Sequence, residues 1–207
     1  MRVASSIPAG TACASPRARH RTTQEEPARL ALAAPPGSFV ARSSVDTAQQ
    51  AEEPFASIKE IKPFSYCCIV HKGPLTDMSG VIAQFMQAMQ SQGLFPSLRG
   101  PMVGVYYNSP AEVKPEELSW EVGFVVSEEA APKPPLEKNN WSYPTVAVAV
   151  HIGPYAKVSE TIQKLMDWMK AKGYVAKGPV LERYLNNPMQ VKPEELRTEI
   201  WIPVSKK

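Results

Sequence analysis

The chain has 207 residues, of which 43% are hydrophobic, 21% charged and 8% aromatic, the composition of a globular protein with one or two domains. Its formal net charge of +3 is too small to indicate nucleic acid or an anionic membrane as the main partner, and no apolar run approaches the ~20 residues that cross a bilayer. The 3 cysteines have no Cys-x-x-Cys spacing, which excludes a disulfide framework and a zinc ribbon, so we expect neither a metal nor a cofactor.

The N-terminal segment, residues 1–53, differs in composition from the remainder of the chain. It contains no lysine and only one aromatic residue, Phe39, and no helical or alternating apolar pattern runs through it. We therefore expect a disordered tail rich in Pro, Arg and Ala, without a helix-turn-helix and without direct contact to nucleic acid. Residues 1–24 lack acidic side chains, which is typical of an organellar targeting segment; an uncleaved tail or a start site placed too far upstream is the alternative.

The first structured elements are predicted between residues 64 and 126. An apolar run predicts a strand over 64–71, and apolar side chains then recur at helical spacing over 77–92. Gly93 stands where a helix commonly ends, and two more strands are predicted over 102–107 and 119–126. The apolar face of the helix, which we expect to be buried on a sheet, consists of Met78, Ile82, Phe85, Met86 and Met89.

The same order of elements is predicted again in the second half. A strand over 144–151 with alternating β-branched residues precedes a helix over 157–172, which ends before Gly173. Strands over 180–185 and 198–204 complete this half. The apolar face of its helix consists of Val158, Ile162, Leu165, Met166 and Met169.

A repeated hexapeptide indicates that the two halves are an internal duplication. Val-Lys-Pro-Glu-Glu-Leu occurs at 113–118 and again at 191–196, and the flanking residues align as well. We expect one α+β domain over 54–207, built from tandem strand-helix-strand-strand modules at about 60–128 and 144–207, with a linker at 129–143. Other aligned pairs are His71 with His151, Gly73 with Gly153, Tyr106 with Tyr184, and Glu121 with Glu199. Each module is expected to have an antiparallel sheet and one long helix, with a ligand groove between the modules.

The last strand suggests where a ligand would bind. Side chains alternate across a strand, so Ile200, Ile202 and Val204 form a row that faces the helix. Glu199 and Trp201 then point to the opposite face, which the helix does not cover. A carboxylate beside aromatic rings attracts lipophilic cations through ion pairing and cation–π contact. The alternative is that Glu199 is an ordinary solvated residue of an exposed sheet face.

Four further residues are candidates for the same site. Tyr106 and Tyr184 occupy matched positions on neighbouring strands, and Glu121 is the counterpart of Glu199 in the first half. Gly123 aligns with Trp201, which predicts open space opposite that ring. Trp120 is the weakest candidate, because alternation points it away from Glu121.

The paired His-x-Gly-Pro turns, the duplicated unit and the closing Glu-Ile-Trp-Ile-Pro-Val over 199–204 resemble the GyrI-like small-molecule-binding family. This family includes the effector-binding domains of some AraC-type and MerR-type regulators, and the resemblance covers about 56–206. It implies two modules around a central groove. In multidrug-sensing members a glutamate of the final strand meets cationic drugs among aromatic rings, which maps onto Glu199, with Trp201, Tyr184 and Tyr106 as candidate ring contributors.

The resemblance leaves three functions open. The first is a stand-alone protein that binds lipophilic or cationic aromatic compounds, as in multidrug or toxin resistance. The second is a hydrolase of strained, cyclopropane-type toxins, in which Glu199 activates water and Tyr184 or Tyr106 donates a proton. The third is a gyrase-inhibitor-like module that binds a protein partner such as DNA gyrase; a haem-binding role ranks below all three. We expect a monomer or weak dimer in the cytoplasm, or an exported or organellar protein if the tail is a targeting segment.

Overall fold

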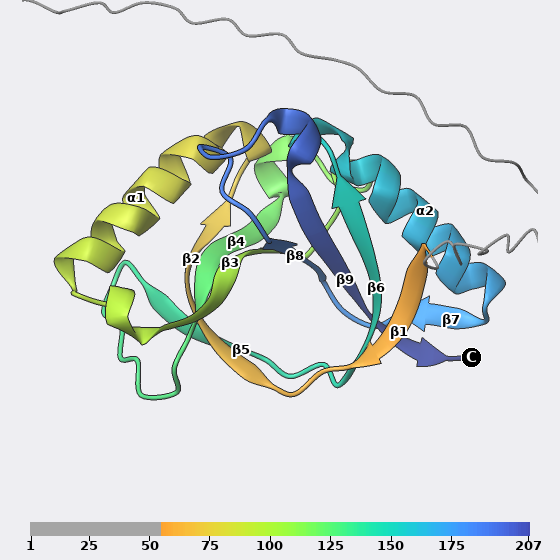
Figure 1. The fold of residues 1–207 in the computed structure, drawn as a ribbon, viewed down its shortest axis with the longest axis horizontal. Coiled ribbons are helices and arrows are strands. Elements are labelled where there is room, and N and C mark those ends of the chain that lie inside the picture. Colours follow the sequence, from red (N-terminus) through yellow and green to blue (C-terminus); the bar gives the residue numbers. More distant parts are fainter. Residues whose placement is uncertain (1–54) are drawn as a thin grey trace, which may run out of the picture. The chain divides into compact units, whose positions relative to one another are not determined.

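A strongly curved antiparallel sheet forms the framework of the computed structural model, which describes residues 55–207 (Figure 1). The predicted tail over 1–53 and its targeting role lie outside the described residues. The strands are β1 (Ala56–Glu60), β2 (Phe64–Lys72), β3 (Leu98–Tyr106), β4 (Ser119–Val126), β5 (Glu137–Trp141), β6 (Thr145–Ile152), β7 (Tyr174–Ala176), β8 (Val180–Tyr184) and β9 (Arg197–Lys206). The helices are α1 (Met78–Ser91) and α2 (Val158–Ala171).

The predicted α+β class and the order of the main elements are confirmed. Both helices agree with their predicted bounds to within one residue at each end, and both are followed by a glycine with positive φ, +65° at Gly93 and +76° at Gly173. That conformation ends a helix at little steric cost only in glycine. Phe85 and Met89 of α1 and Leu165 and Met169 of α2 are buried as expected. The prediction was wrong for Met166, which is 41% exposed.

The two halves share one sheet, where we expected a sheet in each module. Its order is β1-β6-β9-β8-β3-β4-β2-β5, with β7 paired to β9 beside this path. The junction is the pairing of β3 with β8, in which Gly104 lies opposite Glu182. Because the hydrogen bonds of the sheet continue across this junction, the modules form a single nine-stranded unit.

The strands β1 and β5 were not predicted, and β5 lies inside the segment that we interpreted as a linker. Each is exchanged between the halves: β1 precedes β2 in the chain but pairs with β6, whereas β5 precedes β6 but pairs with β2. Ile61, between β1 and β2, donates its N–H to the carbonyl of Pro144, between β5 and β6, at 2.7 Å, which links the two connecting segments. These short strands escape sequence reasoning because Glu137–Trp141 has no apolar alternation.

The core has three parts, and the third overturns one expectation. The helix α1 covers an apolar cluster of the first half around Phe85, and α2 covers a second cluster around Leu165. The opposite face of the sheet, which we expected to be free for a ligand, is filled by a third cluster that includes Tyr66, Trp141 and Trp201. The expectation of an open face was wrong because Trp141 and Trp201 are buried there, at 2% and 6% exposed. Neither helix has the length and apolar character that a bilayer crossing needs.

Candidate functional site

A buried carboxylate lies at the junction of the two halves. Glu182 of β8 pairs with Gly104 of β3, and it is 8% exposed. Strand alternation places Tyr184 on the same face as Glu182 and Tyr106 on the same face as Gly104, which is the face that the helices cover. The two hydroxyls lie 3.0 Å apart, so the structure brings together the two tyrosines that the sequence paired, and adds Glu182 to them.

The hydroxyls form a directed chain of hydrogen bonds that ends on the carboxylate. Tyr184 Oη donates to Glu182 Oε2 at 2.9 Å, and because its single proton is then used, Tyr106 Oη donates to Tyr184 Oη. Burial raises the pKa of Glu182 to about 7, an effect that the tyrosine hydrogen bonds partly offset. Burial also raises the pKa values of Tyr106 and Tyr184, so both remain protonated donors.

Glu182 has no basic partner among residues 55–207. Close contacts between acidic and basic side chains in this range join Lys59 to Glu199, Arg183 to Glu199, and the His71 ring to Asp77, and none involves Glu182. An ionised carboxylate at this depth is held by tyrosine hydroxyls alone, which do not neutralise its charge. A positive charge brought to this position would therefore gain more than it would at a carboxylate already paired.

Gly104 makes room for the two hydroxyls. A Cβ built on Gly104 would lie 2.9 Å from Tyr184 Oη and 3.0 Å from Tyr106 Oη, closer than side chains normally approach. Only glycine at this position lets both phenol groups lie across the strand junction and reach Glu182.

An exposed aromatic ring borders the site from the side of α2. Tyr155 belongs to the turn Tyr155–Lys157 that precedes α2, and it is 40% exposed. Its ring meets that of Tyr184 edge to face, with centroids 5.6 Å apart. Tyr155 therefore packs on Tyr184 with its own ring partly exposed to solvent.

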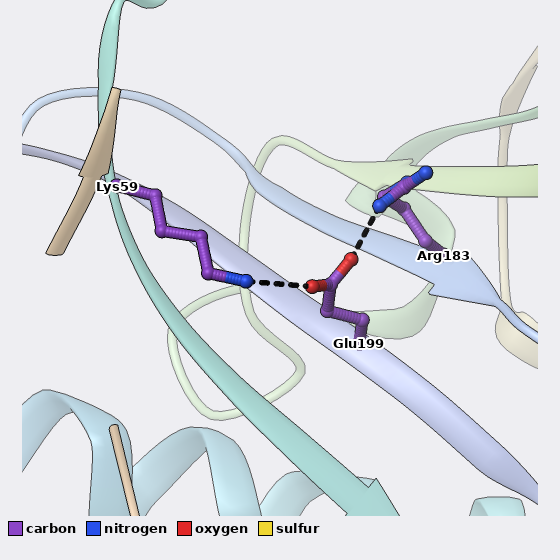
Figure 2. Close-up of polar contacts among 3 residues, drawn as sticks. All are labelled: Lys59, Arg183 and Glu199. Carbon is purple, nitrogen blue, oxygen red and sulfur yellow. Dashed lines mark hydrogen bonds and ion pairs between the residues drawn. The ribbon is translucent and has the colours of Figure 1, made fainter. Parts of the chain in front are cut away.

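Glu199, our leading candidate from the sequence, lies on the opposite face and is already neutralised. Figure 2 shows its carboxylate between two basic side chains: Arg183 of β8 contacts Oε2, and Lys59 of β1 lies 3.4 Å from Oε1. Both oxygens are engaged, which leaves little capacity to meet a cationic ligand or to activate water. The predicted roles of Glu199 in binding or hydrolysis stay predictions that this geometry does not favour.

Trp201 is part of the third core cluster and lies apart from Tyr106 and Tyr184. It is 6% exposed, and its ring lies under the guanidinium of Arg183, 4.6 Å from ring centroid to guanidinium carbon. The predicted combination of Glu199 and Trp201 with the two tyrosines is thus divided between the two faces of the sheet.

Glu121 is buried in a separate hydrogen-bond network. It is 3% exposed and accepts hydrogen bonds from Tyr66 Oη and Tyr107 Oη, both at 2.7 Å, and from Asn139 Nδ2 at 3.0 Å. Asn139 occupies the position in this half that Lys59 occupies in the other: Asn139 pairs with Tyr66 on β2, and Lys59 pairs with Val146 on β6. The residue at the position equivalent to Lys59 is therefore uncharged. Three hydrogen bonds satisfy this carboxylate, which like Glu182 has no basic partner among residues 55–207, and the network does not contact Glu182.

Trp120 and Gly123 have structural roles. Trp120 is buried in the cluster under α1, and its indole N–H donates to the carbonyl of Gly73 at 3.0 Å. The open space predicted at Gly123 is absent, since a Cβ there would lie 2.1 Å from the carbonyl oxygen of Cys67. Gly123 is required because β2 passes close to it.

The sequence contained a signal for Glu182 that our prediction of the site overlooked. The alternation of Val180-Leu181-Glu182-Arg183-Tyr184 places Glu182 on the same face as Tyr184, and the alignment of the halves pairs Glu182 with Gly104. What the sequence could not supply is the register that sets these two positions opposite each other.

Two open depressions occur elsewhere in the described part of the chain, with volumes of about 450 and 520 Å³. They share a wall formed by Pro63, Phe64, Ser65 and Glu128, and neither borders Glu182. No cluster of His, Cys, Asp or Glu over residues 55–207 has the arrangement of a metal site.

Comparison with known proteins identifies the class of this α+β domain as a small-molecule-binding domain. The chain belongs to the GyrI-like small molecule binding domain family, whose model matches residues 55–205. It is 27% identical over 133 residues to the probable transcriptional regulator YgiV of Escherichia coli O157:H7, a match that covers 60% of this chain and 79% of that protein.

Two solved structures have the same fold. The C-terminal domain of EcmrR is 20% identical, with a TM-score of 0.65 over 73% of this chain and 98% of that domain. SAV2435 bound to tetraphenylphosphonium is 14% identical, with a TM-score of 0.54 over 72% of this chain and 93% of that one. The expected stand-alone role, gyrase partner, oligomeric state and cytoplasmic location stay predictions.

Proposed function

We propose that this protein binds lipophilic cations, aromatic ones above all, at Glu182, with Tyr184 and Tyr106 beneath the ligand and Tyr155 at the entrance. The observation that carries the proposal is a carboxylate that is 8% exposed and has no basic partner among the described residues. A cationic ligand would provide the positive charge that no described side chain brings to Glu182.

The energetics favour a cation that is also apolar. A charge–charge contact gains strength where water is excluded, but a strongly hydrated cation loses that gain when it is desolvated. Aromatic and lipophilic cations are weakly hydrated, and their rings or apolar groups can pack on Tyr155 and Tyr184. The site therefore selects delocalised or shielded positive charge over small ammonium ions.

The relationship to SAV2435 supports this class of ligand, since that protein is described with a bound tetraphenylphosphonium ion. With regulators among its relatives, the chain is proposed to sequester such compounds or to report their presence to a partner.

Binding requires ionised Glu182, so affinity for a cation should increase with pH up to about 7 and then level off.

Isothermal titration of the full chain with tetraphenylphosphonium tests the proposal. Below pH 7 the ionised fraction of Glu182 rises about tenfold for each pH unit. We expect the association constant of the wild type to rise by the same factor. Glu182→Gln should lose most of the affinity and all of this pH dependence. Glu199→Gln is the matched control, with the same chemical change on the other face. Loss of binding in Glu199→Gln but not in Glu182→Gln would refute the assignment to Glu182 and restore the one made from sequence.

A further inference from the structure

Glu182 lies on an approximate twofold axis that relates the two halves of the sheet. In the pairing of β3 with β8, Gly104 lies directly opposite Glu182. These two residues are also counterparts in the alignment of the halves, as are Tyr106 and Tyr184. Two equivalent residues that face each other mark the point through which the axis passes. Each backbone position on one side of Glu182 therefore has an equivalent on the other side, which can carry a different side chain.

The strand register is the same on the two sides of this axis. Gly104 pairs with Val122 on β4, and Glu182 pairs with Ile200 on β9. Val122 and Ile200 are separated by the same number of residues as Gly104 and Glu182, so all four positions correspond. The approximate symmetry thus extends over β4, β3, β8 and β9.

The turns that precede the two helices also correspond. Leu75–Asp77 precedes α1 and Tyr155–Lys157 precedes α2, and each turn follows a proline in the extended conformation. Each is held by a glycine N–H that donates to a leucine carbonyl at 2.9 Å, from Gly73 in the first half and from Gly153 in the second. The first residues of the two turns therefore occupy equivalent places on either side of the axis.

These first residues, Leu75 and Tyr155, offer apolar surface to solvent to the same degree, at 39% and 40% exposed. Tyr155 lies against Tyr184, with ring centroids 5.6 Å apart. By the symmetry of the backbone, Leu75 lies across the axis, on the side of Tyr106. An accessible apolar group, one from each half, therefore flanks Glu182 on each side.

The charged side chains of the two turns do not oppose a cation at the axis. Asp77 ends the first turn and Lys157 ends the second, so the two charges are opposite and occupy equivalent places. Their effects on a charge at the axis offset each other. Glu160 in the first turn of α2 adds a charge of the same sign as Glu182. Glu182 thus sets the sign of the charge that a ligand carries here, and the turns provide apolar contacts beside it.

We propose that the ligand of this site straddles the axis, so that the protein selects lipophilic cations whose charge lies between two apolar groups. The proposal rests on the binding of cations at Glu182 proposed above. The charged atom lies at Glu182, one apolar group packs on Tyr155, and the other packs on Leu75. A cation whose charge lies at one end can reach only one of these side chains from the same position, and it loses one apolar contact.

Two isomeric cations test the proposal by isothermal titration of the full chain. Dibenzyldimethylammonium has its quaternary nitrogen between two aromatic rings, whereas (p-phenylbenzyl)trimethylammonium has the same atoms with the nitrogen at one end. We expect the wild type to bind the first isomer about fivefold to tenfold more tightly, which is the contribution of one partly buried apolar group. Equal affinities, or tighter binding of the second isomer, would overturn the proposal.

Truncation of either flanking side chain should remove this preference. Leu75→Ala and Tyr155→Ala should each weaken the binding of dibenzyldimethylammonium by about fivefold and bring the two isomers to similar affinities. Leu185→Ala is the matched control, because this leucine is 43% exposed and strand alternation directs it to the face opposite Tyr184. A preference that survives either truncation, or that Leu185→Ala removes, would contradict the straddling position.

Glu182→Gln separates this proposal from the one on which it rests. If the variant loses affinity for both isomers while the wild type binds them equally, cations bind at Glu182 but do not straddle the axis. If the variant binds both isomers as tightly as the wild type does, the cation site itself is wrongly placed.

Discussion

Glu182 and Arg183 are consecutive residues of β8 whose charged groups lie on opposite faces of the sheet, one among tyrosine hydroxyls and the other against Glu199 and Trp201. Because of this alternation, the guanidinium of Arg183 cannot pair with the buried carboxylate of Glu182, although the two residues are neighbours in the sequence. Arg183 is neutralised by Glu199, whereas no basic side chain among residues 55–207 pairs with Glu182, so the two glutamates lie in different electrostatic surroundings.

The stability of the protein should fall as the pH rises through the range in which Glu182 ionises. Its pKa of about 7 is raised above the ordinary value of 4.5, so between these values the folded state holds a proton that the unfolded chain releases, and stability present below pH 4.5 is lost as the pH rises to about 7. A shift of this size corresponds to about 3 kcal/mol at most. Glu182→Gln should remove this loss, so that urea unfolding finds the variant more stable than the wild type at pH 8 and similar to it at pH 5. Equal pH profiles would show that Glu182 does not carry this effect.

Replacement of Gly104 by alanine should disturb the hydroxyl chain. The new Cβ would lie within 3.0 Å of both phenol oxygens, so at least one tyrosine must move, at a cost of about 1–3 kcal/mol in the free energy of unfolding. Affinity for tetraphenylphosphonium should fall with it. Gly80→Ala is the control, because a Cβ on this residue of α1 meets nothing within 4 Å and should stabilise the helix by about 0.5–1 kcal/mol.

Tyr184→Phe should raise the pKa of Glu182 further. The substitution removes the hydroxyl that donates to Oε2 at 2.9 Å and keeps the ring that packs on Tyr155. Loss of a donor to the charged form disfavours ionisation. The midpoint of the pH dependence of tetraphenylphosphonium binding should therefore move above that of the wild type. Tyr107→Phe, which removes a phenol from Glu121 instead, should leave this midpoint unchanged.

Glu199→Gln should destabilise the protein more than removal of its exposed partner. The substitution leaves Arg183, whose side chain is 26% exposed, without a neutralising carboxylate, and we expect a loss of about 1–2 kcal/mol, below the range for fully buried pairs. Lys59→Met should cost less than about 1 kcal/mol, because that side chain is 51% exposed. Thermal unfolding of the two variants under the same conditions measures the difference. A larger effect for Lys59→Met would mean that β1 is held mainly by this contact.

Local pattern was enough for most of the fold. Apolar spacing predicted α1 and α2 to within one residue at each end, and glycine chemistry predicted where they stop. Strand alternation correctly placed Ile200 and Ile202 in the core opposite Glu199. It also contained the position of Glu182 beside Tyr184, which our prediction of the site overlooked. The strands β1 and β5 were missed because they are short and lack a periodic pattern.

The sequence by itself determined the elements, the family resemblance and which residues share a face of each strand, since these depend on neighbours a few positions apart. Only the tertiary structure decided which of those faces is buried and which carboxylates lie beside basic side chains. Lys59 lies 140 residues from Glu199 in the chain, and the pairing of β1 with β6, next to β9, brings them together. Burial and ion pairing are properties of the assembled sheet, and within residues 55–207 they leave Glu182 buried at the junction of the halves without a basic partner.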